Sequence, residues 1–272
     1  KLPLKKLTPV KKINEFRDST YFSHINGIRS WENKFFINHY EAHRIVILDT
    51  NLNFLTFVGK KGRGPGEILA PTDICKNKNE LYITDAGNKK ISVFTKYEDN
   101  YRLKHEFEVS FSELRNNMCF TIIDSLIYIV SPHSDKPIQT YSLKGKKLKR
   151  FGYNVKFETK NPFRKLFYID SNPKVGIIAV SVTEPVIIQY NMEGNLLKRI
   201  DLSNVDILKG TIFANRKYYS SANRNSIRPL FGNFCLQENK LYLKLNLNEN
   251  DLENKRNKVL VLRIDKDSIY PE

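Results

Sequence analysis

Residues 58–94 read VGKKGRGPGEILAPTDICKNKNELYITDAGNKKISVF, and this stretch decides the fold. A loop rich in glycine ends at Glu67 and leads into a first apolar run that begins at Pro71. A second apolar run begins at Leu81, a polar turn follows it, and a third apolar run begins at Ile91. Short apolar runs separated by Asp, Asn and Gly predict β-strands joined by tight turns.

The same hairpin layout recurs along the chain. It begins at Lys34, Glu80, Leu126, Gly176 and Lys240. Equivalent positions are 46, 46, 50 and 64 residues apart, counted over Phe35, Leu81, Ile127, Ile177 and Leu241. A period of about 40–50 residues with short strands is typical of a propeller blade, whereas a sandwich lacks such self-similarity. The sequence therefore predicts an all-β propeller of four-stranded antiparallel blades, forming one domain over residues 1–272.

Six blades are favoured over five. Strands from residues 2–22 are expected to complete the last blade, because a terminal strand that closes the ring hides exposed sheet edges. Helical signals are weak, and only Ser110–Asn116 resembles a short helical turn that Ser112 would cap.

The stretch 58–94 resembles the NHL-type propeller repeat, in which a G-x-G-P-G-E loop precedes an LY-[IV]-x-D-x-x-N-x-[RK]-I hairpin. The whole chain resembles the TolB-like six-bladed propellers that Gram-negative bacteria export, often as lipoproteins. This resemblance implies the fold and an extracytoplasmic location, in the periplasm or attached to the outer membrane. It implies little about activity, because the same fold carries many functions.

The glycine-rich loop has a structural interpretation. Its glycines allow positive φ, Pro65 stiffens the passage between blades, and Glu67 is expected to accept hydrogen bonds from loop amides. The structural residues are Gly62, Gly64, Pro65, Gly66 and Glu67. The alternative is an anion-binding nest beside Lys60, Lys61 and Arg63.

The hairpin turns supply candidate ligand-binding residues, because such turns line one mouth of a propeller channel. The candidates are His39, Asp85, His133, Glu184 and Asn246. A metal-dependent hydrolase with calcium or zinc in the channel is one alternative, although no residue is assigned as catalytic or metal-ligating and no cofactor is expected. For Asp85, the competing interpretation is a turn residue that bonds its own backbone.

Residues 207–232 form a distinctive basic insertion, expected to be a loop or a strand pair. It interleaves aromatic and basic residues and contains no acid: Arg216, Lys217, Tyr218, Tyr219, Arg224 and Arg228 are its candidate ligand-binding residues. Long loops on a rigid scaffold often bind partners. The leading hypothesis is therefore an extracytoplasmic binding or scaffolding module with a protein or glycan partner.

The net charge of +16 raises the question of nucleic acid, which is the second alternative. The positive residues are scattered through every repeat and no nucleic-acid-binding motif is present, so nucleic acid is not expected as the partner. No apolar stretch approaches the roughly 20 residues that span a bilayer.

The chain begins at Lys1 rather than Met, which suggests a processed or trimmed product. A lipid anchor on a removed N-terminus is one option, and the sequence leaves open whether a lipid-attachment cysteine lay upstream. Its three cysteines are too widely spaced to indicate a disulfide framework or a zinc finger. The sequence leaves the oligomeric state open.

Overall fold

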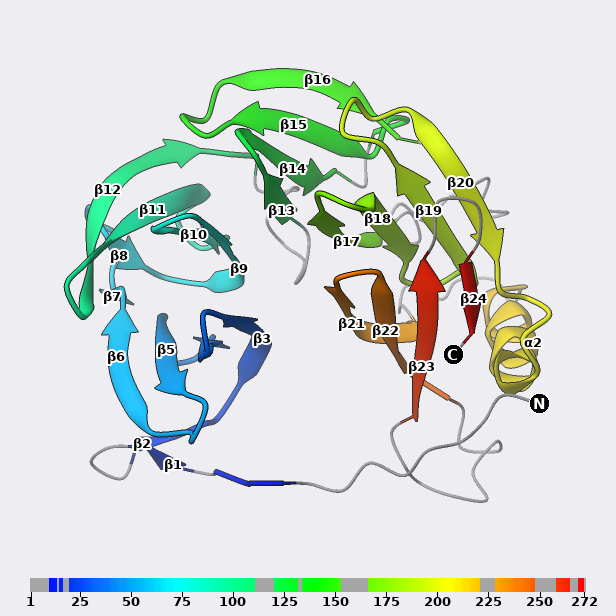
Figure 1. Ribbon diagram of the computed structural model, residues 1–272, viewed down its shortest axis with the longest axis horizontal. Helices are drawn as coiled ribbons and strands as arrows, with labels where there is room; N and C mark the ends of the chain where they lie inside the picture. Colours follow the sequence, from blue (N-terminus) through cyan, green and yellow to red (C-terminus); the bar gives the residue numbers. More distant parts are fainter. Residues whose placement is uncertain are drawn as a thin grey trace. The chain divides into compact units, whose positions relative to one another are not determined.

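The computed structural model describes residues 10–13, 15–16, 20–110, 120–131, 134–152, 166–220, 228–247, 258–264 and 269–271. Within them, five four-stranded sheets follow one another along the chain (Figure 1). Strand pairing is antiparallel, so the predicted all-β propeller with four-stranded antiparallel blades is confirmed. We number the five sheets as blades 1 to 5 in chain order.

The strands of each blade pair in sequence order. Blade 1 consists of β3 (Ile25–Trp31), β4 (Lys34–His39), β5 (Arg44–Asp49) and β6 (Phe54–Val58). Blade 2 consists of β9 (Pro71–Asn77), β10 (Glu80–Asp85), β11 (Lys90–Tyr97) and β12 (Asn100–Glu108). Blade 3 consists of β13 (Phe120–Ile123), β14 (Leu126–Val130), β15 (Ile138–Ser142) and β16 (Lys147–Phe151). Blade 4 consists of β17 (Phe167–Asn172), β18 (Gly176–Ser181), β19 (Val186–Tyr190) and β20 (Leu196–Asp201). Blade 5 consists of β21 (Phe231–Gln237), β22 (Lys240–Leu245), β23 (Lys258–Ile264) and β24 (Ile269–Pro271).

Two small sheets stand outside the blades. β1 (Glu15–Phe16) pairs with β2 (Thr20–Tyr21), and β7 (Lys60–Lys61) pairs in parallel with β8 (Glu67–Ile68). In the described part of the chain, every strand of the five blades lies at or after Ile25. The N-terminal contribution expected for a last blade is therefore not seen among the described strands, and blade 5 is completed by β24 instead.

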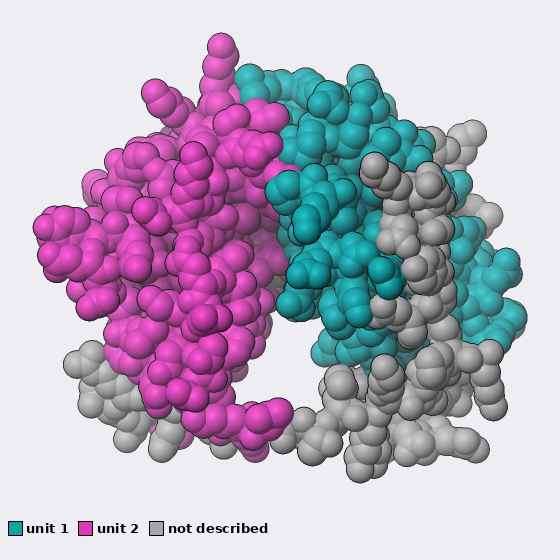
Figure 2. All heavy atoms as spheres, in the orientation of Figure 1, with its two compact units in different colours: residues 1–4, 128–140, 148–272 teal, residues 5–127, 141–147 magenta. Residues whose placement is uncertain are grey.

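The chain divides into two compact units, coloured separately in Figure 2. Unit 2 comprises residues 5–127 and 141–147 and contains blades 1 and 2. Unit 1 comprises residues 1–4, 128–140 and 148–272 and contains blades 4 and 5, while the strands of blade 3 contribute to both units. One domain over residues 1–272 stays a prediction.

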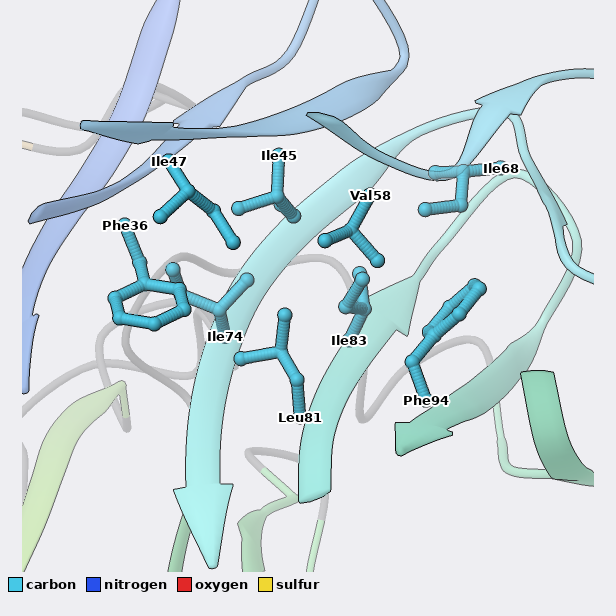
Figure 3. Packing of buried hydrophobic residues seen from close by; sticks show 9 residues of the cluster. All are labelled: Phe36, Ile45, Ile47, Val58, Ile68, Ile74, Leu81, Ile83 and Phe94. Carbon is cyan, nitrogen blue, oxygen red and sulfur yellow. The ribbon is translucent and has the colours of Figure 1, made fainter. Parts of the chain in front are cut away.

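The core of unit 2 fills the space between blades 1 and 2 (Figure 3). Side chains alternate across a strand, so one set of residues from each blade faces the other blade. The cluster comprises Phe36, Ile45, Ile47, Val58, Ile68, Ile74, Leu81, Ile83 and Phe94, all of them buried. Burial of each such side chain contributes about 1.5–3 kcal/mol, which makes this the main apolar contact of the unit.

The opposite face of blade 1 is apolar as well. Ile37, Val46 and Leu48 are buried there, and Ile13 and Phe22 from the N-terminal segment pack against them. Residues on both faces of β4 and β5 are therefore covered, which explains why these strands read as continuous apolar runs in the sequence.

In unit 1, aromatic rings join blades 3 and 4. The Phe151 ring makes edge contacts with Tyr128 and Tyr190, with ring centroids 6.0 and 5.4 Å away, and the Tyr128 hydroxyl donates to the Met192 carbonyl at 3.0 Å. The turn at Gly194, between β19 and β20, lies over the same ring, because a Cβ on Gly194 would be 2.4 Å from Phe151 Cγ.

One helix, α2 (Asp206–Ser220), lies between β20 and β21 in the chain. The prediction of a loop or strand pair over residues 207–232 is wrong for this part. Leu208, Thr211, Ile212 and Asn215 are buried at helical spacing, but two of the four are polar, so the apolar period was not visible in the sequence. The helical turn expected at Ser110–Asn116 lies outside the described residues beyond Ser110.

Gly194→Ala is expected to destabilise the protein by about 2–4 kcal/mol. Gly194 has φ +82°, where an L-residue is strained, and the added methyl overlaps Phe151. Urea unfolding measures the change as a lower midpoint. Gly27→Ala is the matched control, because its added Cβ would meet nothing within 4 Å; equal losses in the two variants would contradict the packing argument.

Candidate functional site

Asp85, at the end of β10, holds the segment that leads into its own blade. Its carboxylate accepts hydrogen bonds from the amides of Leu69 and Ala70 at 2.9 and 2.8 Å. The turn amides of Gly87 and Asn88 add bonds of 3.2 and 3.3 Å. The side chain is 0% exposed, so its acceptor sites are taken by the chain itself. We call this arrangement the amide clamp of blade 2.

Asn88 extends the clamp to the glycine-rich loop. Its side-chain amide donates to Asp85 Oδ2 at 2.7 Å and to the Gly62 carbonyl at 2.9 Å. The interpretation of Asp85 as a turn residue that bonds its own backbone therefore agrees with these contacts. A ligand that approached the Asp85 carboxylate would have to displace the backbone amides that are bonded to it.

Glu67 lies where the alternative interpretation of the glycine-rich loop places an external anion. Its Oε2 accepts from the Gly64 amide at 2.8 Å, and Lys60 Nζ lies 3.2 Å from its Oε1. The bond from Gly64 and the charge of Lys60 hold the pKa of Glu67 below its ordinary value. A Cβ on Gly62 would lie 2.0 Å from Glu67 Oε2, so glycine is required for this close approach. The loop thus carries its own anion, as the structural interpretation expected.

The other side of the loop is fixed by Glu106 from β12. Glu106 Oε1 accepts from Lys90 Nζ at 2.6 Å, from Ser92 Oγ at 2.8 Å and from the Gly66 amide at 3.1 Å. Burial favours a raised pKa for Glu106, but the bonds from Lys90 and Ser92 outweigh it and hold the pKa low. The loop is therefore pinned by charged groups on both of its arms.

His39 plays the same part in blade 1. Its Nε2 accepts from the Ser23 amide at 3.3 Å and lies 3.1 Å from Ser23 Oγ. The next residue, Tyr40, donates its amide to the His24 carbonyl at 2.9 Å. His39 is buried, and this burial, reinforced by Arg44 and opposed by Glu41, lowers the pKa of its imidazole.

The two clamps are related by the sequence repeat. In blade 2 the amide of Ala86 donates to the Ala70 carbonyl at 2.9 Å, which matches the Tyr40 bond of blade 1. Each equivalent pair is separated by 46 positions: Ser23 and Leu69, His24 and Ala70, His39 and Asp85, Tyr40 and Ala86. His39 and Asp85 are therefore two chemical solutions to one structural task.

The remaining candidates from the hairpin turns lie in other blades. Glu184 donates its backbone amide to Ser181 Oγ at 3.2 Å in blade 4, and Asn246 donates its amide to the Leu230 carbonyl at 3.0 Å in blade 5. His133 lies outside the described residues. In the described part of the chain, no three His, Cys, Asp or Glu side chains gather as metal ligands would. Calcium or zinc in the channel stays an untested alternative.

Helix α2 carries the described residues 207–220 of the basic insertion. One face, with Leu208 and Ile212, is buried against unit 1, whereas Phe213 on the other face is 71% exposed. Lys209, Arg216 and Lys217 are also exposed and stand three or four residues from Phe213, so they border its ring.

The end of the helix is organised by Arg228. The Arg228 guanidinium carbon lies 3.9 Å from the centre of the Tyr218 ring. The Tyr219 hydroxyl accepts from the Arg228 amide at 2.7 Å and donates to the Arg228 carbonyl at 3.0 Å. We define the α2 surface as Lys209, Phe213, Arg216, Lys217, Tyr218 and Arg228. Arg224 lies outside the described residues.

Five four-stranded antiparallel blades define the class of the protein as a β-propeller. Residues 15–150, half of the chain, match DUF5128, described as a 6-bladed beta-propeller, and the chain belongs to this family. The family is thus six-bladed, whereas the described residues form five blades. No curated protein matches the sequence.

Solved structures share the fold at low sequence identity. A protein from Bacteroides fragilis, named as exported, is 16% identical; the match covers 95% of this chain and 73% of that one, with a TM-score of 0.59. A member of the duf4221 family from Bacteroides vulgatus is 12% identical over 94% of this chain and 84% of that one, with a TM-score of 0.56. A catalytically inactive virginiamycin B lyase from Staphylococcus aureus, solved with quinupristin, is 12% identical over 91% and 69%, with a TM-score of 0.53. At these identities the likeness concerns the fold alone.

Asp85→Ala is expected to destabilise the protein by at least about 3 kcal/mol, because it leaves buried backbone amides without their charged acceptor. Urea unfolding followed by tryptophan fluorescence measures the loss. Asp99→Ala, at an exposed turn position of the same blade, should change stability by less than about 0.5 kcal/mol. Similar values for the two variants would show that the clamp is dispensable.

The lowered pKa of His39 predicts that the protein loses stability in acid. This pKa is lowered in the folded protein, so below the ordinary histidine pKa of about 6.5 the unfolded state binds more protons than the folded state. The free energy of unfolding should therefore decrease as the pH falls from 7.5 to 5.5. The His39→Asp variant places an aspartate at the position in blade 1 that is equivalent to Asp85. In this variant the part of the decrease in unfolding free energy that is due to His39 should vanish, whereas His24→Gln, at an exposed position, should retain it. Parallel pH curves for wild type and His39→Asp would refute the assignment.

Proposed function

We propose that this propeller is a binding or scaffolding module that contacts a macromolecular partner, protein or glycan, through the α2 surface. The observation that carries the proposal is the exposed Phe213, which stands among Lys209, Arg216 and Lys217 on a helix whose other face is packed. Aromatic and arginine side chains are enriched at interface cores, and a few of them usually supply most of the binding energy.

The hairpin turns support this choice indirectly. Asp85 and His39 are the two candidates of unit 2, and both accept hydrogen bonds from the segments that lead into their own blades. Their chemistry serves the scaffold, so recognition is left to residues outside the repeat. The insertion before blade 5 departs from the regular spacing, and helix α2 within it carries exposed aromatic and basic groups.

We place the protein outside the cytoplasm, as an exported propeller. Its sequence resembles the TolB-like and NHL-type propellers, and a neighbour in fold from Bacteroides fragilis is named as exported. In the described part of the chain, no helix has the length and apolar character needed to cross a membrane. Fractionation of the cells that make the protein tests this location, and recovery with cytoplasmic proteins would contradict it.

A photo-crosslinking amino acid at position 213, introduced in the cells that make the protein, is expected to give a discrete crosslinked product. The product should disappear when Arg216→Glu and Lys217→Glu are added, because charge reversal at the rim weakens association. The same crosslinker at Tyr97, also exposed but in blade 2, is the positional control. A product that survives the charge reversal, or that forms equally from position 97, would remove the α2 surface from the proposal.

A further inference from the structure

The chemistry of the α2 surface narrows the class of its partner. From residue 207 to residue 220 the chain contains three basic residues and no acidic one. The acid of the helix, Asp206, lies in the first turn, where its Oδ1 is 2.8 Å from Lys209 Nζ. The half of the helix beyond Phe213 is therefore positive, and Arg228 adds its charge at the same end.

A lipid surface fits this helix poorly. Amphipathic helices that lie on membranes bury a whole apolar face among the lipids. Here that face is turned into the fold, because Leu208 and Ile212 are buried, and Phe213 is the large apolar residue of α2 that remains exposed. One aromatic side chain gives too little apolar area to hold the protein on a bilayer.

Stacked ligands fit poorly as well. Nucleic-acid bases and sugar rings bind aromatic side chains face to face, and a row of open rings is the usual platform. The guanidinium of Arg228 covers a face of Tyr218, and the backbone of Arg228 engages the hydroxyl of Tyr219. Among the described aromatic residues of α2, Phe213 is the one with a largely exposed ring, so these residues offer no row of stacking sites.

The arrangement suits a protein segment that presents carboxylates around one apolar side chain. The carboxylates would meet Arg216 and Lys217, while the apolar group would cover Phe213. The guanidinium of Arg228 is held against the Tyr218 ring, with its carbon 3.9 Å from the ring centre, and the backbone of Arg228 is bonded to the Tyr219 hydroxyl and to the side-chain amide of Asn215. A fixed guanidinium loses little side-chain freedom when it binds a carboxylate, and its planar fork suits carboxylate geometry.

We propose that the α2 surface binds an acidic segment of a partner protein, with an apolar residue of that segment packed on Phe213. This inference rests on the function proposed above and specifies its partner. It concerns a protein ligand, so an anionic lipid or an anionic glycan at the same site would be a different outcome.

The decisive experiment is mass spectrometry of the product crosslinked at position 213. We expect a partner peptide in which Asp and Glu outnumber Lys and Arg around the crosslinked residue. A neutral or basic peptide, a lipid or a glycan would overturn this inference and leave the proposed function standing. Absence of any product that depends on Arg216 and Lys217 would instead overturn the proposed function itself.

Binding of the purified protein to the synthetic peptide identified by the crosslink gives the second readout. Arg216→Glu with Lys217→Glu should weaken binding at least tenfold at 0.15 M salt, and Phe213→Ala should weaken it to a similar extent. Lys144→Glu with Lys146→Glu makes the same charge change at an exposed turn of blade 3 and should alter the dissociation constant less than threefold. Equal weakening by both charge reversals would show that only net charge matters and would overturn the assignment.

Vesicles that contain phosphatidylserine form the third arm, at the same salt concentration. We expect no sedimentation of the protein with these vesicles. Sedimentation that Phe213→Ala abolishes would assign the surface to lipid and overturn the inference. Because Phe213 is exposed, this variant should fold normally, and its thermal unfolding checks that point.

Discussion

The carboxylate of Asp85 is the constraint on which the rest of unit 2 depends. A buried negative charge is costly unless hydrogen bonds surround it, and here the amides of two segments converge on it. The same bonds fix Leu69 and Ala70, and through them the position of Ile68, which lies in the core between blades 1 and 2. The glycine-rich loop is then closed by Glu67 and Glu106, so electrostatics fixes the connection and apolar packing fixes the blades that it joins.

The comparison of blades 1 and 2 shows how one geometry tolerates two chemistries. Asp85 accepts hydrogen bonds through two carboxylate oxygens. His39 uses one ring nitrogen, which accepts from the Ser23 amide and lies within hydrogen-bond distance of the Ser23 hydroxyl. The imidazole of His39 accepts only while that nitrogen is unprotonated. The connection into blade 1 is therefore expected to weaken in acid, and blade 1 has additional apolar cover from Ile13 and Phe22 on its other face.

Local patterns made the fold predictable, because strands, turns and glycine requirements are set by neighbours in sequence. The repeat follows from the five hairpin segments that begin at Lys34, Glu80, Leu126, Gly176 and Lys240, and the role of Glu67 as an acceptor of loop amides follows from residues 58–94. The role of His39 as an acceptor for the segment that enters blade 1 was not predicted, although His39 lies 46 residues before Asp85. The reason is that histidine does not share the turn preference of aspartate. Helix α2 was missed because Thr211 and Asn215 fill buried positions and Gly210 lowers helix propensity. The kind of partner that α2 suits depends on which of its side chains are exposed, and that exposure is set by the packing of the folded chain.

The place of α2 in the chain also bears on how such propellers diversify. The helix is carried by the connection from β20 to β21, whose two ends belong to separate sheets of unit 1. Lengthening a connection between fixed ends costs little entropy, because that cost grows only with the logarithm of its length. Selection can therefore rewrite this segment, changing its charge, length or aromatic content, while the strands beside it keep their pairing. In this protein the repeated strands fix the blades, and the connection from blade 4 to blade 5 has room to change without disturbing their pairing.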